Sequence, residues 1–214
     1  MLRVVTSTRG ISRCAGVFDV EALQADYGLQ RTIWTLVMNY FLMQALNNQW
    51  ANHRLHNACK ILSREEYAAP RSGFFPSIRH TLCHILDVDL YYLAALQGDL
   101  PGQDINVPPD LDFETLQQRQ ARLDLQLADF CRALSDTDLL RKVTLRRAEG
   151  EVRERIDRLL LHLFEHQIHH RGQVHCMLSG SSVAPPQLDE FFLQADARFR
   201  EDEMRALGLS ERGW

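Results

Sequence analysis

The sequence predicts an all-α fold, a helical bundle with one long crossover and a short helical extension near its C-terminal end. Only 7 prolines and 11 glycines occur in 214 residues, fewer than a strand-rich fold with many tight turns needs. Apolar residues recur at steps of three and four along several long segments, which is the period of a helix with one buried face. Residues 98–112 form a long Pro- and Gly-rich connection, typical of a crossover between bundle helices.

The N-terminal residues differ in composition from the rest of the chain. We expect residues 1–30 to form a poorly structured extension, residues 31–209 to form the domain, and residues 210–214 to be a tail. Arg3, Arg9 and Arg13 precede the first acidic residue, Asp19, and an organelle transit peptide can have this pattern as well. Met38 is an alternative start, so it stays open whether residues 1–37 belong to the native protein.

Four long segments have helical periodicity. The first covers residues 34–62, where Gln44 and Asn48 interrupt the apolar face and predict a polar patch on the inner seam. After the loop sequence AAPRSGFFP, Ser77 is placed to cap a second helix that runs to about residue 96. A third helix is expected over residues 113–134 and a fourth over residues 153–178.

Two shorter elements complete the expected fold. Residues 143–152 combine Val, Thr and Leu with a short polar turn, which indicates a small hairpin. Residues 188–207 indicate one or two further short helices, with aromatic residues that contact the bundle. Any of these aromatic residues that are exposed could pair two copies of the chain, so a homodimer is one expectation.

The composition excludes several classes of function. A formal net charge of −4 and a pI near 6.1 give no basic surface for nucleic acid. No apolar run reaches the roughly 18 residues that a membrane span needs. The 5 cysteines are scattered and include no CxxC pair, which favours reduced thiols and a cytoplasmic protein.

The histidines are the candidate functional residues because they cluster. The fourth predicted helix carries an apolar stripe that runs from Ile156 through His166 and His170 to Met177. Two helical histidines four residues apart project from the same side and can bind one metal ion. All 9 histidines fall in three segments: His53 and His56; His80 and His84; His162, His166, His169, His170 and His175.

The spacing leaves some alternatives open. His162 lies off the apolar stripe and about 12 Å along the helix from His170, so we expect it at the rim of a site rather than on the same ion. A third ligand could come from His84 or His80 on the second predicted helix, and spacing slightly favours His84. The competing interpretation is a bundle whose core histidines are hydrogen-bonded and bind no metal.

Four motifs resemble those of the DinB family: NNQWANHRL, SIRHTLCHIL, HLFEHQIHHRGQVH and PPQLDEFF. The resemblance covers roughly residues 38–209 and implies an up-down-down-up four-helix bundle with three histidines around a divalent metal, typically nickel or zinc. Carried over by motif, the ligands are His84, His166 and His170. Asp89 matches a recurrent acidic residue, although a solvated or helix-packing carboxylate is an equal interpretation. Arg171 and Gln173 match the RGQ portion of the third motif, and we expect both to hold the fourth predicted helix to its neighbours.

The resemblance implies a metal-dependent enzyme, a thiol S-transferase or hydrolase. Such an enzyme would use a low-molecular-weight thiol as cosubstrate and act on a small electrophile. Gln44, Asn48 and Asp89 are candidate pocket groups, and His162 is a candidate support for the ligands. The alternative is a non-catalytic, metal-binding stress-response protein in which the three histidines stabilise the bundle.

Overall fold

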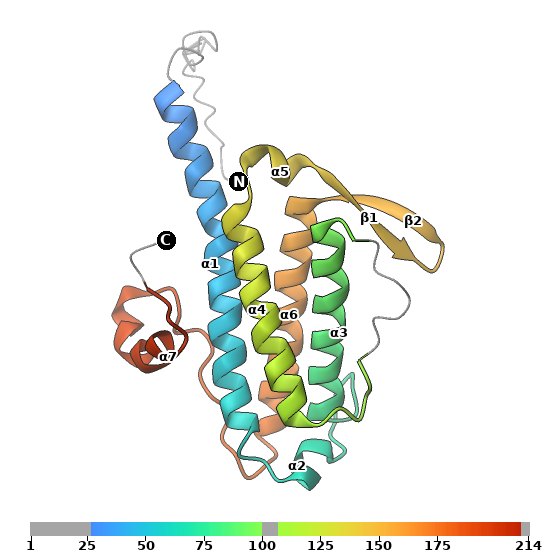
Figure 1. The fold of residues 1–214 in the computed structure, drawn as a ribbon. Coiled ribbons are helices and arrows are strands. Elements are labelled where there is room, and N and C mark those ends of the chain that lie inside the picture. The colour runs from blue at the N-terminus through green and yellow to red at the C-terminus, as the bar shows by residue number, and fades with distance from the viewer. Residues whose placement is uncertain (1–26, 100–106, 211–214) are drawn as a thin grey trace, which may run out of the picture.

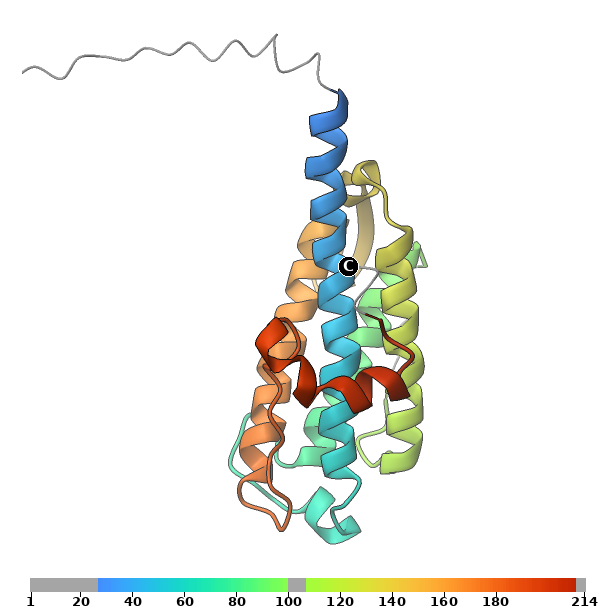
Figure 2. The ribbon, with the colours of Figure 1, turned by 90° about the vertical axis from the view of Figure 1, so that its left-hand side faces the viewer.

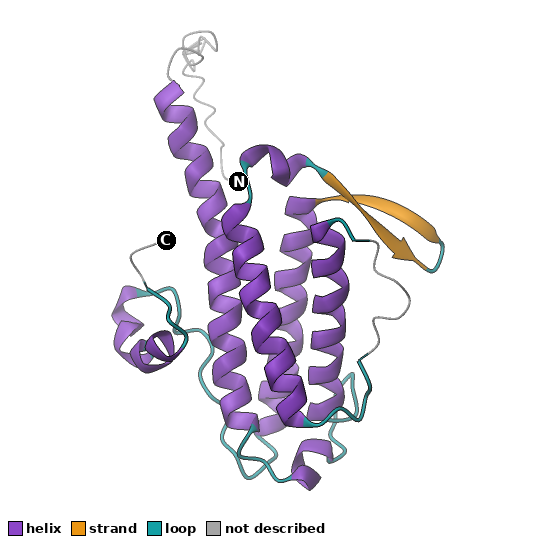
Figure 3. Ribbon diagram, viewed as in Figure 1, coloured by secondary structure: helices purple, strands orange, loops and turns teal. Residues whose placement is uncertain are grey.

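The computed structural model describes residues 27–99 and 107–210, and it describes side chains from Tyr40 onward. The expected extension over residues 1–30 and the expected tail over residues 210–214 therefore lie almost wholly outside the described residues. The helices and the one small sheet are shown by type in Figure 3.

Four long helices lie side by side and form the body of the protein (Figures 1 and 2). Helix α1 packs against α4 and α6, and α3 packs against the same two helices. In Figure 1, α1 and α6 run from the top of the view to the bottom, whereas α3 and α4 run the opposite way. The bounds of these helices are α1 Tyr27–Cys59, α3 Ile78–Gln97, α4 Phe113–Ala133 and α6 Ile156–Leu178.

Short elements connect and flank the long helices. Strands β1 (Lys142–Arg147) and β2 (Gly150–Arg155) pair antiparallel, with Leu145 opposite Val152. The fold is therefore mainly helical and not all-α, because this hairpin, which the sequence indicated, is present. The other short elements are α2 (Arg64–Ala68), α5 (Asp136–Leu140), a 3-10 helix (Gln194–Phe199) and α7 (Glu201–Ala206).

Local chemistry sets the ends of α3, which carries one of the candidate ligands. Ser77 precedes the helix and its Oγ accepts a hydrogen bond from the His80 backbone N–H at 3.2 Å. Gly98 ends the helix with a φ of 91°, a left-handed conformation that glycine adopts without strain. The predicted bounds of this helix agree with the structure.

Three predicted helix bounds differ from the structure by more than one residue. The first helix begins at Tyr27 rather than residue 34, so it includes the last residues of the extension expected over residues 1–30. The first helix ends at Cys59 rather than residue 62, because Ser63 and Glu66 form a capping box that starts the separate helix α2. The fourth begins at Ile156 rather than residue 153, because Arg153 pairs with Thr144 in the hairpin.

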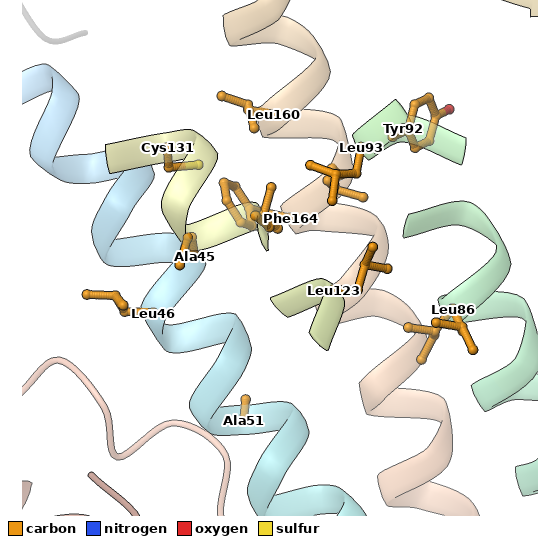
Figure 4. Packing of buried hydrophobic residues seen from close by; sticks show 14 of the residues in the cluster. Ala45, Leu46, Ala51, Leu86, Tyr92, Leu93, Leu123, Cys131, Leu160 and Phe164 are labelled. Atoms are coloured by element: carbon orange, nitrogen blue, oxygen red, sulfur yellow. The ribbon is translucent and has the colours of Figure 1, made fainter. Parts of the chain in front are cut away.

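The core lies between the four helices and combines large aliphatic side chains with small residues on α1 (Figure 4). Ala45 and Ala51 are buried on α1, and Leu86 and Leu160 are fully buried on α3 and α6. Polar residues are buried in the same interior, most of them amides and carboxylates. No helix in the described part of the chain is long and apolar enough to cross a membrane.

Candidate metal centre

Three imidazoles from two helices converge on one point. His84 comes from α3, and His166 and His170 come from successive turns of α6. Each offers one ring nitrogen, and these three nitrogens all lie within 4.8 Å of one another. The Nε2 atoms of His84 and His166 are 3.0 Å apart.

The helical spacing explains this convergence. The rings of His166 and His170 are 4.4 Å apart between centroids, as expected for residues one turn apart on one face. The ring of His84 lies 5.0 Å from His166 and 4.7 Å from His170, so it faces both. The packing of α3 against α6 therefore brings the third nitrogen to the pair.

The loop before α3 covers part of the cluster. The ring of Phe75 lies 4.5 Å from His84 and 5.6 Å from His170, between centroids. Burial is the main reason that the pKa of each of the three histidines is lowered, and that of His166 falls to about 3. The neighbouring imidazoles lower the pKa of His166 further. At neutral pH the three rings are therefore uncharged and can donate lone pairs to a cation.

Gln173 orients His170. Its Oε1 lies 2.8 Å from Nδ1 of His170, so this ring nitrogen carries the proton and Nε2 is left for a metal. The amide nitrogen of Gln173 is 3.0 Å from Nε2 of His169. We expected Arg171 and Gln173 of the RGQ portion to hold helices together. Arg171 does so, because it donates hydrogen bonds to Asn48 and Asn52 on α1, whereas Gln173 lies beside the candidate ligand. The i, i+3 spacing from His170 was the sequence signal for this contact.

The other histidines near the site lie outside the cluster. His162 is exposed, with its ring 6.5 Å from that of His166 and 5.4 Å from that of Tyr92. It thus lies next to the cluster, at the rim. The Nδ1 atom of His80 is 2.7 Å from Oγ of Ser77, the residue that caps α3.

Two of the candidate pocket residues belong to a buried polar network. Asn48 donates a hydrogen bond to Asp124 at 3.2 Å and accepts one from Arg171. Asp89 accepts hydrogen bonds from Gln167 and, at 2.8 Å, from Gln120. Both residues are at most 3% exposed. Gln44, the third candidate, is half-buried on α1.

The cluster has the chemistry of a transition-metal site. Two uncharged imidazoles that aim Nε2 atoms at each other across 3.0 Å repel unless a proton or a cation lies between them. Zinc binds histidine nitrogens at about 2.0–2.1 Å, a distance that places neighbouring ligand atoms near this separation. Nitrogen ligands also suit nickel and zinc better than calcium or magnesium.

Fold and cluster together define a class of protein: a mainly helical bundle with a three-histidine site that could hold a divalent metal ion. The chain belongs to the DinB family, because the model for this family matches residues 38–204. The family resemblance found in the sequence motifs is thereby confirmed.

Individual relatives agree with this assignment. Protein DinB of Bacillus subtilis (strain 168) is 26% identical over 152 residues, which cover 66% of this chain and 86% of that protein. Uncharacterized protein YizA of the same organism is 31% identical over 119 residues, covering 54% and 72%. The crystal structure of a DinB-like protein from Bacillus cereus ATCC 10987 covers 64% of this chain and 90% of that chain, with a TM-score of 0.50 and 17% identity. This last likeness shows the fold alone.

Proposed function

We propose that His84, His166 and His170 bind one divalent transition metal ion, nickel or zinc. The observation that supports this most directly is the convergence of their ring nitrogens within 4.8 Å. Burial keeps the rings uncharged, and Gln173 fixes the tautomer of His170. The proposal includes the finer description of the fold as an up-down-down-up bundle, which the helix directions in Figure 1 support.

We further propose that the protein is a metal-dependent enzyme, a thiol S-transferase or a hydrolase. A metal held by three neutral ligands keeps its full charge and an open coordination position, where it can stabilise a thiolate or a hydroxide. The partners of such an enzyme are a low-molecular-weight thiol cosubstrate and a small electrophile. In this chain, His84, His166 and His170 hold the ion, and Gln173 keeps His170 in the coordinating tautomer. The exposed His162 lies beside the cluster, with its ring 6.5 Å from that of His166.

A non-catalytic, metal-binding role is the second candidate. Phe75 packs against two of the three rings, and this cover favours a closed site that stabilises the bundle. The two candidates differ at the fourth coordination position. An exchangeable water there supports the enzyme, whereas a closed position supports the structural role.

We also propose a cytoplasmic location. The four cysteines in the described residues are free: Cys59, Cys83, Cys131 and Cys176. Free cysteines suit a reducing compartment.

Metal analysis of paired variants tests the proposed site. We expect the wild-type protein, purified without chelators, to carry about one equivalent of nickel or zinc. His170→Ala should lose this metal, because it removes one of three ligands. His169→Ala is the matched control and should keep it, because His169 offers no ligand atom to the cluster. Equal metal content in the two variants would refute the assignment.

A further inference from the structure

Helix α6 carries two adjacent stripes of functional side chains. His166 and His170 form one stripe, and Gln167 and Arg171 form the other, each with a spacing of four residues. One residue corresponds to about 100° around a helix, so the first stripe faces His84 while the second points into the bundle. The rotation and register of α6 therefore fix both stripes together.

The second stripe takes part in a buried polar network that joins all four long helices. Gln167 donates to Asp89, which lies on α3 only five residues after His84. Gln120 on α4 donates to Asp89 at 2.8 Å and to Asp124 at 3.1 Å. The Gln167–Asp89 hydrogen bond thus directly links the two helices that carry the candidate ligands.

Arg171 connects this hydrogen bond to α1. Its Nη1 donates to Asn48, to Asn52 at 3.1 Å and to Oε1 of Gln167 at 3.1 Å. The Gln167 amide is therefore held at both ends, with its oxygen on Arg171 and its nitrogen on Asp89. This arrangement leaves Gln167 one orientation, because a flipped amide would aim a donor at the guanidinium.

The charges in the network also favour a single arrangement. Arg171 is the cation, and Asp89 and Asp124 are the carboxylates, each at most 4% exposed. Burial raises the pKa of both carboxyl groups to about 7 and lowers that of Arg171 to about 10, so the arginine stays charged at neutral pH. A buried cation that loses its partners is strongly destabilised. A shift of α6 relative to α3 would separate Gln167 from Asp89, and a shift relative to α1 would separate Arg171 from Asn48 and Asn52, so both shifts are disfavoured.

We propose that Gln167 is a positioning residue, and that its hydrogen bond to Asp89 holds α6 in the register that brings His166 and His170 to His84. This inference rests on the proposed metal site. The hydrogen bond ties α6 to α3 close to the three imidazoles, since Asp89 lies five residues after His84 and Gln167 lies next to His166. The expected consequence is that the metal affinity of the folded protein depends on the Gln167–Asp89 hydrogen bond.

A reversal of the donor and the acceptor tests the proposal. Gln167→Glu places a carboxylate against Asp89, and we expect the dissociation constant for zinc to rise about tenfold or more. The double variant Gln167→Glu with Asp89→Asn restores one donor and one acceptor between these two positions and keeps the charge count, with the new amide oxygen at position 89 turned to accept from Gln120. Its dissociation constant for zinc should return to within about threefold of the wild-type value. The effects of two substitutions at residues in direct contact are not additive, so the second should offset the first. Gln118→Glu, the same change on the exposed face of α4, is the control and should have no effect.

A second variant separates positioning from stability. Gln167→Met replaces the amide with an apolar chain of similar length and leaves Asp89 bonded to Gln120. Because this change removes one hydrogen-bond partner each from Asp89 and Arg171, the melting temperature in chelator should fall, and zinc affinity is therefore measured at a temperature where the variant is fully folded. Zinc affinity should still fall about tenfold, and the visible spectrum of the cobalt-loaded protein should change. Wild-type affinity in this variant, or no recovery in the double variant, would overturn the proposal.

A metal-independent measurement distinguishes this proposal from that of the metal site. Nuclear Overhauser contacts between the rings of His84 and His166 should be present in the metal-free wild type and weakened in Gln167→Met. If the wild type binds no metal, the proposed function fails, and these contacts still test the positioning role. Unchanged contacts in Gln167→Met would overturn it.

Discussion

At the scale of single residues, the amide of Gln173 determines which ring nitrogen of His170 is available to bind a metal ion. Its oxygen accepts the Nδ1 proton at 2.8 Å, and its nitrogen faces His169. Hydrogen-bonding partners of ligand histidines typically alter metal affinity by about 10-fold to 100-fold. Gln173 is therefore part of the proposed site, although it is not a metal ligand itself.

Gln173→Leu tests this role. We expect zinc affinity to fall by about tenfold or more, because His170 loses the acceptor that fixes its tautomer. His169→Ala leaves the Gln173 oxygen in place, so its affinity should fall by less. Competition with a chromophoric chelator measures both constants. A Gln173→Leu protein that binds zinc as tightly as the wild type would contradict the assignment.

A second single residue, His56, is expected to make the protein sensitive to acid. It is 4% exposed on α1, with its ring 5.9 Å from that of Phe113. Burial, followed by the charges of His53 and Arg171, lowers the pKa of His56 from 6.5 to about 4. The unfolded chain therefore takes up this proton at a higher pH than the folded protein, and acid favours unfolding.

His56→Gln should reduce this acid sensitivity. The stabilising contribution of His56 is fully present above pH 6.5 and is lost as the pH falls towards 4. Each unit of pKa shift corresponds to about 1.4 kcal/mol, so the difference in unfolding free energy between wild type and variant should shrink by roughly 3 kcal/mol over this range. Urea unfolding in chelator at several pH values measures it. A difference that is constant with pH would show that His56 does not titrate in this way.

At the scale of elements, the start of α3 sets where His84 lies along the helix. Ser77 is 1% exposed, and its Oγ accepts from the His80 backbone N–H. Ser77→Ala removes this cap and should lower the unfolding free energy by about 1 kcal/mol. Ser63→Ala, at the start of the five-residue helix α2, is a comparison at a short helix away from the ligands. Chemical denaturation measures both, and a Ser77→Ala protein as stable as the wild type would contradict the role of the cap.

The sequence predicted elements well wherever local chemistry decides them. Ser77 and Gly98 signalled both ends of α3 because capping depends on a few neighbouring residues. The sequence-based prediction of helix bounds failed where two local signals compete. Ser63 caps a new helix directly after the expected first one, which itself ends three residues early, and Arg153 joins a strand although helical periodicity starts nearby. In the second case cross-strand pairing outweighs the helical pattern.

At the scale of the whole molecule, the candidate site was only partly predictable. The spacing of His166 and His170 placed two rings on one face, because both lie on one helix. The choice of His84 over His80 came from the family resemblance, since it depends on how α3 is rotated against α6. Asn48 and Asp89 were expected near a pocket, and their hydrogen bonds lie within a network that spans helices. Such pairings across helices depend on packing, which sequence periodicity does not specify.

Metal removal should affect the stability of the entire bundle, because the three candidate ligands belong to α3 and α6 and meet only in the folded protein. An ion that binds only the folded state adds about 2.7 kcal/mol when its free concentration is 100 times the dissociation constant. For a domain of this size that corresponds to a rise in Tm of roughly 5–10 °C. Scanning calorimetry with excess zinc and with chelator should show this difference in the wild type and in His169→Ala, but not in His170→Ala. The same rise in His170→Ala would mean that the stabilising ion binds elsewhere.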